Sequence, residues 1–118
     1  MFRIKRAYEP PGPEDGFRVL VDRLWPRGLS RRAAAIDLWL KEIAPSAELR
    51  RWFRHDPQRW AEFTRRYRVE LRTAERSAAF ERLRAAEREK GTVTLLFAAR
   101  DATHSHAAAL LALLNERR

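Results

Sequence analysis

Two clusters of polar side chains in this 118-residue chain have the residue types that bind anions or transfer protons. Each cluster follows a run of apolar residues that predicts a β-strand. The first cluster contains Asp22, Arg23 and Arg27, and the second contains Arg100, Asp101, His104 and His106. In open α/β sheets, ligands bind beyond the carboxyl ends of the strands. If the two strands are parallel neighbours, both clusters meet at one edge, and we therefore predict a polar cleft there.

The chemistry expected of this cleft is the binding of a phosphorylated or otherwise anionic small molecule, with or without catalysis. Asp22 would act as a general base or orient the ligand, and His106 would be its acid–base partner. The remaining residues of both clusters would hold the anion; they are Arg23, Arg27, Arg100, Asp101 and His104. An ion pair between Asp22 and Arg23 or Arg100 that only stabilises the fold explains the same residues equally well.

Three apolar segments predict the strands that position these clusters, at residues 2–8, 17–25 and 92–98. The second has a Val-Leu-Val centre that is apolar on both faces, as in a buried central strand. Residues 37–43 fit either a strand or a helix, and we favour a strand. These segments predict a single α/β domain over residues 1–118, with a small, mostly parallel sheet flanked by helices.

Helical periodicity and capping residues predict the helices. The expected N-caps are Ser30, Ser46, Asp56 and Thr103, and Gly91 is expected to end the helix before the last strand. One helix face carries Trp60, Phe63, Tyr67 and Leu71 at helical spacing, which predicts core packing. His55, directly before the Asp56 cap, is expected to be solvated.

Composition excludes several classes of function. The chain has no cysteine, which excludes disulfides, thiol nucleophiles and cysteine-bound metals, and we expect neither a metal nor a cofactor. The chain has only four glycines, and the sequence contains neither a glycine-rich phosphate-binding loop nor a dinucleotide-binding motif. The sequence lacks an apolar membrane span and a signal peptide, so a cytoplasmic protein is expected, away from membranes. The sequence specifies no particular oligomeric state.

The net charge of +9 leaves a second function open. The arginine-rich helices from Arg50 to Arg88 would bind nucleic acid through its phosphates, in a regulatory protein for example. The basic residues are scattered, however, and abundant Arg and Ala also follow from GC-rich codons. A third reading is an interaction module without chemistry, in which an exposed Trp52 or Trp25 contacts a partner.

Residues 18–29, with the sequence RVLVDRLWPRGL, resemble the signature of YeaO-like proteins, a branch of the domain-of-unknown-function family number 488. Further matches lie at residues 39–46, 49–53, 55–57, 60–67 and 94–101 and at His104 and His106. The resemblance implies a compact α/β domain of uncharacterised function. The broader family often carries Cys-His-Arg after its last strand. Here that stretch is Ser105-His106-Ala107, which argues against thiol chemistry in this chain.

Overall fold

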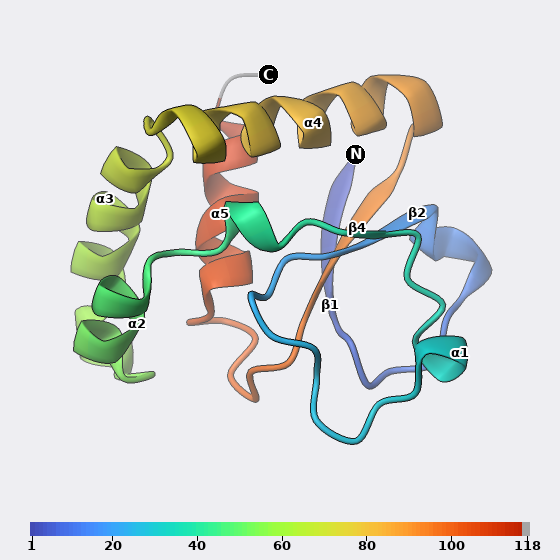
Figure 1. Cartoon of the computed structure of the whole chain (residues 1–118), viewed down its shortest axis with the longest axis horizontal. Helices are drawn as coiled ribbons and strands as arrows, with labels where there is room; N and C mark the ends of the chain where they lie inside the picture. The colour runs from blue at the N-terminus through green and yellow to red at the C-terminus, as the bar shows by residue number, and fades with distance from the viewer. Residues whose placement is uncertain (117–118) are drawn as a thin grey trace.

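The computed structural model of the protein describes residues 1–116, which form a four-stranded parallel sheet surrounded by helices (Figure 1). The strand order is β1-β4-β2-β3, and every neighbouring pair is parallel. The strands are β1 (Phe2–Arg6), β2 (Phe17–Leu20), β3 (Leu38–Trp39) and β4 (Val93–Phe97). The predicted α/β class is confirmed, and β2 and β4 are the parallel neighbours on which the predicted cleft depends.

All four strands are shorter than predicted, β2 and β3 by the most. The prediction that a strand continues to residue 25 is wrong, because β2 leaves the sheet after residue 20. At that point the carboxylate of Asp22 accepts a hydrogen bond from the Ala98 backbone N–H (2.9 Å), so a side chain replaces the next backbone acceptor. Within residues 37–43, Leu38–Trp39 pair with β2, and a 3-10 turn, Lys41–Ile43, follows.

The helices are α1 (Arg31–Ala34), α2 (Ala47–Phe53), α3 (Trp60–Glu70), α4 (Ala74–Lys90) and α5 (His106–Asn115). Two further 3-10 turns are η1 (Pro13–Asp15) and η3 (Pro57–Arg59). The caps predicted at Ser30, Ser46 and Asp56 are confirmed, since each side chain accepts a backbone N–H at the start of its element. None of the described helices combines the length and apolar character needed to cross a membrane.

The prediction that Thr103 caps the last helix is wrong. Ser105 is the cap of α5, and its Oγ accepts the Ala108 backbone N–H at 3.1 Å. Residue 103 is unavailable because the Asp101 carboxylate already accepts the N–H groups of Thr103 and His104 in a separate turn. The helix therefore begins at His106, directly after this turn.

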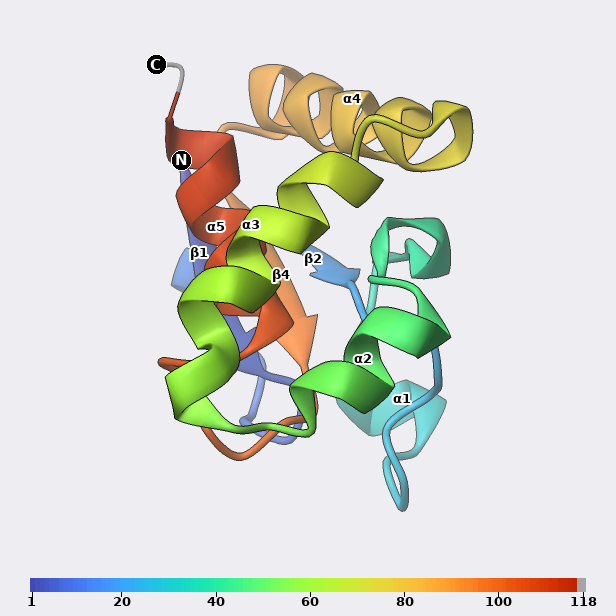
Figure 2. The same ribbon diagram turned by 90° about the vertical axis from the view of Figure 1, so that its left-hand side faces the viewer.

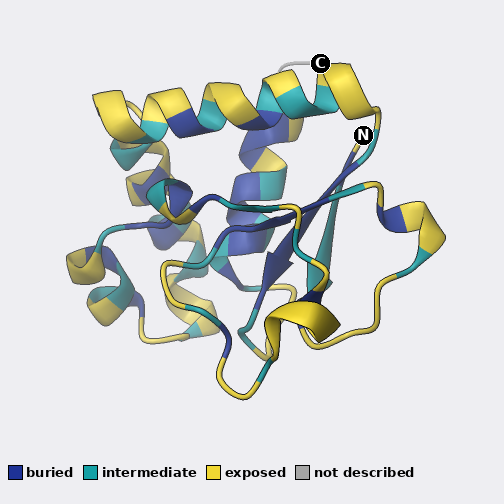
Figure 3. Ribbon diagram, turned by 45° about the vertical axis from the view of Figure 1, so that its right-hand side comes forward, coloured by how far each residue is buried: buried dark blue, intermediate teal, exposed yellow. Residues whose placement is uncertain are grey.

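Helices α2, α3 and α5 cover one face of the sheet, and α4 runs across its amino-terminal end (Figures 1 and 2). The main core lies between these helices and the sheet, and buried residues follow the inner sides of the helices in Figure 3. The opposite face has a smaller core, in which Trp25, Ile36 and Trp39 pack on Leu20 and Leu96. β4 is buried along its whole length between the two cores.

A buried ionic cluster lies at the amino-terminal side of the sheet. The Asp15 side chain is 1% exposed, and its carboxylate accepts hydrogen bonds from Arg18, Lys5 and the Gly12 backbone N–H. The Arg18 guanidinium, also buried, donates to the backbone oxygens of Ala34 and Ala35 as well. This cluster ties the loop before β2 to the end of α1.

Candidate functional site

A hollow of about 380 Å³ opens at the carboxyl ends of the strands. Its polar lining comes from the segment after β2, from α2 and the turn that follows it, and from the start of α5. The charged and titratable lining residues are Tyr8, Asp22, Arg23, Arg27, Arg50, His55 and His106. The hollow therefore combines parts of the chain that are more than 80 residues apart, as expected where parallel strands end together.

Asp22 and His106 face one another inside this hollow. The imidazole Nε2 of His106 lies 3.2 Å from Asp22 Oδ1 and 3.2 Å from the Val21 backbone oxygen. Two oxygens around Nε2 indicate that this nitrogen carries a proton, and the better aligned bond is to Val21. Asp22 Oδ2 accepts the Ala98 N–H. The pair thus ties the ends of β2 and β4 to the first residue of α5.

Two polar atoms of this site have no hydrogen-bond partner. Asp22 Oδ1 and Arg50 Nε are the buried side-chain nitrogen and oxygen atoms that lack a partner in the described part of the chain. The contact of Oδ1 with His106 is close but not aligned as a hydrogen bond. Folded proteins pair nearly all buried polar atoms, and each exception calls for an explanation. Both residues line the hollow, and the two atoms themselves are buried beneath its surface.

Arg50 reaches the hollow from α2, where its neighbours Leu49 and Phe53 pack into the core. Among residues 1–116 its guanidinium has no ion-pair partner, whereas Arg65, Arg66 and Arg68 pair with carboxylates. Guanidinium groups bind carboxylates and phosphates through two parallel hydrogen bonds.

The turn after α2 carries a conformation that side chains adopt with difficulty. Arg54 and His55 both have positive φ angles, 51° and 54°, although neither is glycine. Arg54 is the left-handed C-cap of α2, a common way for a helix to end, and His55 continues this conformation for one more residue. The turn lets the chain reverse direction before the Asp56 cap, so that His55 lines the hollow while Phe53 stays in the core.

A second, smaller cavity of about 70 Å³ adjoins the hollow. The two share four residues: Arg50, His55, Ala99 and His106. The aromatic rings of Phe53 and Phe63 complete the lining of the smaller cavity. The two spaces are therefore neighbours, and we call the smaller one the inner compartment.

Four of the seven residues predicted to share a cleft line this hollow: Asp22, Arg23, Arg27 and His106. The predicted juxtaposition of Asp22 and His106 is confirmed, while their chemical roles remain predictions. The structural ion pair expected as an alternative for Asp22 is not formed with Arg23 or Arg100 among the residues described; Asp22 contacts His106 instead.

The other three residues do not line the hollow. His104 Nδ1 lies 2.9 Å from Asp101 Oδ2, and Arg100 is exposed beside them. The hydrogen bond from His104, together with backbone N–H donors, lowers the pKa of Asp101 below its usual value. The prediction that Arg100, Asp101 and His104 line the cleft is therefore wrong: Asp101 and His104 bond to each other in a local turn, and Arg100 is exposed beside them. Their role in ligand binding remains a prediction.

Sequence reasoning missed two lining residues, Arg50 and His55. Arg50 is one of 22 arginines, and nothing in its local sequence separates it from its exposed neighbour Arg51. His55 was expected to be solvated, and it is exposed, yet it borders both cavities. The one available signal was the match of residues 55–57 to the family pattern.

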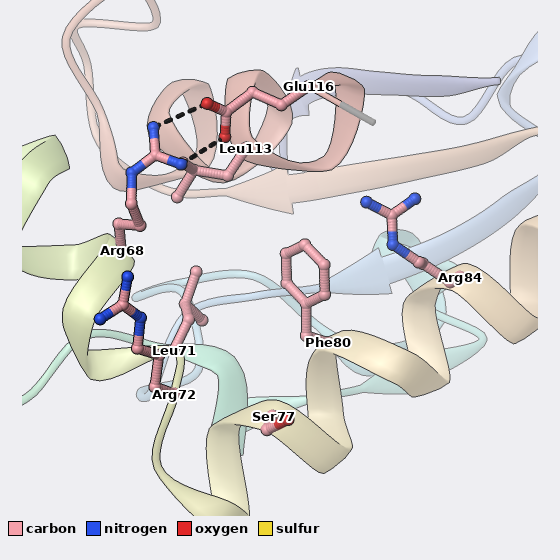
Figure 4. A pocket seen from close by; sticks show the side chains of 8 residues that line it. All are labelled: Arg68, Leu71, Arg72, Ser77, Phe80, Arg84, Leu113 and Glu116. Atoms are coloured by element: carbon pink, nitrogen blue, oxygen red, sulfur yellow. Dashed lines mark hydrogen bonds and ion pairs between the residues drawn. The ribbon is translucent and has the colours of Figure 1, made fainter. Parts of the chain in front are cut away.

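Another hollow, of about 450 Å³, lies between α3, α4 and α5 (Figure 4). It contains three arginines over the apolar side chains of Leu71, Phe80 and Leu113. Arg68 pairs with Glu116 through two bonds of 2.7 Å, as Figure 4 shows. Arg84 lies over the Phe80 ring and donates to the Leu114 backbone oxygen. Two of its three arginines are thus already engaged, which makes this hollow the weaker candidate.

No group of three or more His, Cys, Asp or Glu side chains able to hold a metal is found within residues 1–116. The hollow at the strand ends has arginines and histidines around one carboxylate, which contacts a backbone N–H group and an imidazole.

Comparison with known proteins gives one family and several relatives. The family model DUF488-N3i, described as the inactive DUF488-N3 subclade, matches residues 1–118. The uncharacterised protein YeaO of Escherichia coli is 43% identical over 108 residues, 92% of this chain and 91% of that protein. An uncharacterised protein of Mycobacterium tuberculosis is 43% identical over 115 residues, 98% and 94% of the two chains. No solved structure matches significantly.

Proposed function

This chain belongs to the DUF488-N3i family, the inactive DUF488-N3 subclade, and from that premise we propose that it binds a small polar anion without transforming it. The proposed site is the hollow at the carboxyl ends of the strands. Membership confirms the resemblance to YeaO-like proteins of family 488 that the sequence predicted. The relatives are themselves uncharacterised, so the proposal rests on the geometry of the site.

The observation that carries the proposal is the pair of unpartnered polar atoms, Arg50 Nε and Asp22 Oδ1. An unpaired buried donor or acceptor costs about 1–3 kcal/mol. A ligand with an oxyanion for the Arg50 guanidinium and a hydroxyl or N–H group for the Asp22 carboxylate would bind the two residues that carry these atoms. A hydroxylated phosphate or carboxylate has both groups, and the hollow of about 380 Å³ falls within the usual size of small-molecule sites.

The balance of charge also supports an anion. Arg23 and Arg27 are exposed at the rim, and Arg50 lies deeper. Asp22 is the single carboxylate of the lining, and it faces His106. Three arginines against one carboxylate make the hollow electropositive, which attracts anions and raises the rate at which they bind.

Binding without turnover agrees with the absence of serine, threonine, cysteine and lysine nucleophiles from the described lining. Ser105, which stands where the broader family often has cysteine, is 1% exposed. Its Oγ is occupied as the cap of α5 and donates to the Ala102 backbone oxygen at 3.2 Å. A hydroxyl fixed in this way serves the helix and is not free to attack a substrate.

Isothermal titration calorimetry with phenyl phosphate tests the proposal. The wild-type protein should bind it saturably, and Arg50→Gln should weaken binding by about ten- to a hundredfold, because a charge-assisted hydrogen bond contributes roughly 1.5–3 kcal/mol. Arg51→Gln is the matched control, since it removes the same charge from an exposed site on the same helix. We expect its affinity to equal that of the wild type.

Nucleic-acid binding through the arginine-rich helices is the alternative function that would replace this proposal. A short oligonucleotide should bind weakly if the site prefers small anions. If instead Arg50→Gln has no effect while Arg65→Gln together with Arg72→Gln abolishes steeply salt-dependent oligonucleotide binding, the helices are the binding surface. The contacts of Glu62 with Arg65 and Arg66 count against that outcome, because they neutralise part of the helix charge.

A further inference from the structure

We propose that the inner compartment takes a terminal oxyanion, one attached to the rest of its ligand through a single bond, and rejects bridging anions such as phosphodiesters. This inference rests on the proposed anion site and specifies which ligands it accepts. The open hollow would hold the body of the ligand, and the compartment beside it would hold the anionic end.

The size of the compartment limits what can enter. Its volume is about 70 Å³, against about 380 Å³ for the hollow beside it. One water molecule needs a cavity of roughly 10–15 Å³ on this kind of measure, so the compartment has room for a few non-hydrogen atoms. A carboxylate, a sulfate end or a phosphate end is of this size, whereas a sugar or a nucleobase is not.

The side chains of Phe53 and Phe63 form one wall of the compartment. Phe53 and Phe63 are 4% and 0% exposed, and their rings stack with centroids 4.3 Å apart. Phe63 stacks in turn on Tyr67, whose hydroxyl donates to the Ile43 backbone oxygen. This packing fixes the position of that wall. A phosphodiester has substituents on both sides of its phosphorus, and both must be accommodated at the junction before its anionic oxygens enter the compartment, which a terminal oxyanion does not require.

The polar groups of the compartment suit an anion that arrives through the hollow. Arg50, with its unpartnered Nε, and the rings of His55 and His106 line both spaces. These three side chains come from α2, from the turn after it and from the start of α5. They therefore stand at the junction of the two spaces, where the end of a ligand would meet them.

Ala99 offers a way to close the compartment without changing any charge. Its side chain borders both spaces, and its residue is half-buried. Ala99→Val adds two methyl groups at the junction. Ala102→Val makes the same change at an exposed residue three positions further along and serves as the matched control.

The experiment measures the affinities of four probes by calorimetry: phenyl phosphate, phenyl sulfate, benzoate and methyl phenyl phosphate. Phenyl sulfate and methyl phenyl phosphate both carry one negative charge. They therefore differ in whether the anionic group is attached at one side or at two, and not in charge. We expect phenyl sulfate to bind at least about tenfold more tightly than the diester. Phenyl phosphate and benzoate distinguish a phosphate end from a carboxylate end, and preference for either one fits a terminal oxyanion.

The variants then locate the binding. Ala99→Val should weaken the best probe by at least about tenfold, while Ala102→Val should bind it as the wild type does. Equal affinity for the sulfate and the diester, or unchanged binding by a folded Ala99→Val protein, would overturn the terminal-anion inference and leave the anion site itself standing. If no probe binds the wild-type protein, the proposed function fails, and this inference fails with it.

Discussion

Asp15→Ala should destabilise the protein by about 3–5 kcal/mol, the usual cost of breaking a buried ion pair by removing one partner. The variant leaves the Arg18 guanidinium, which is 4% exposed, without the carboxylate that compensates its charge. Lys5 and the Gly12 N–H lose their acceptor as well. Urea denaturation monitored by circular dichroism measures the change. Glu14→Ala, which removes the neighbouring exposed carboxylate, should change stability by no more than about 0.5 kcal/mol.

The effect of Asp15 should depend on pH. Burial raises the pKa of this carboxyl, but the Gly12 N–H, Lys5 and Arg18 lower it more, so it lies below its usual value. An unfolded aspartate titrates near about 3.9. As the pH falls, the unfolded chain therefore takes up a proton at this residue before the folded protein does. The stability that the Asp15 carboxylate contributes is fully present above the pKa of unfolded aspartate, and it is lost as the pH falls through the pKa of Asp15 in the folded protein. The difference in free energy of unfolding between the wild type and Asp15→Ala should be constant above about pH 5 and shrink below about pH 4. A difference that grows on acidification would contradict this assignment.

Phe63→Ala should cost about 3–5 kcal/mol, because it empties a large volume in a core that cannot collapse to fill it. The Phe63 ring is fully buried between Phe53 and Tyr67, with centroid separations of 4.3 Å and 5.9 Å. The midpoint of urea denaturation, with an unchanged slope, measures the loss. A variant within about 1 kcal/mol of the wild type would exclude this stacked triplet as the centre of the core.

Trp60→Ala is the informative comparison for Phe63→Ala. The sequence predicts both residues in the core at equal cost, since they lie three positions apart on one helix. Trp60 is only half-buried, and its indole N–H donates to the Ser105 backbone oxygen at 3.1 Å. We therefore expect a smaller loss than for Phe63→Ala in the same denaturation experiment. Equal losses would mean that the indole contact with the start of α5 contributes as much as full burial.

Local hydrogen bonds explain which elements could be predicted along the chain. Ser30, Ser46 and Asp56 cap their helices through contacts with residues two or three positions away, so the sequence contains all that is needed. Thr103 failed as a cap for an equally local reason, because the Asp101 carboxylate competes for the same segment. The end of β2 could not be predicted in this way, since it depends on the bond between Asp22 and Ala98, 76 residues apart.

The sequence by itself determined the parallel α/β arrangement and the meeting of Asp22 with His106, because buried parallel strands must end at one edge and each residue follows such a strand. Only the tertiary structure decided that Arg50 and His55 line the same hollow as Asp22 and His106. Arg50 and Arg51 are the same residue type on the same helix, and packing of Leu49 and Phe53 against the core alone selects which one faces the hollow. Where a side chain points depends on which helix face is buried against distant residues, and that packing acts between segments that no local pattern connects.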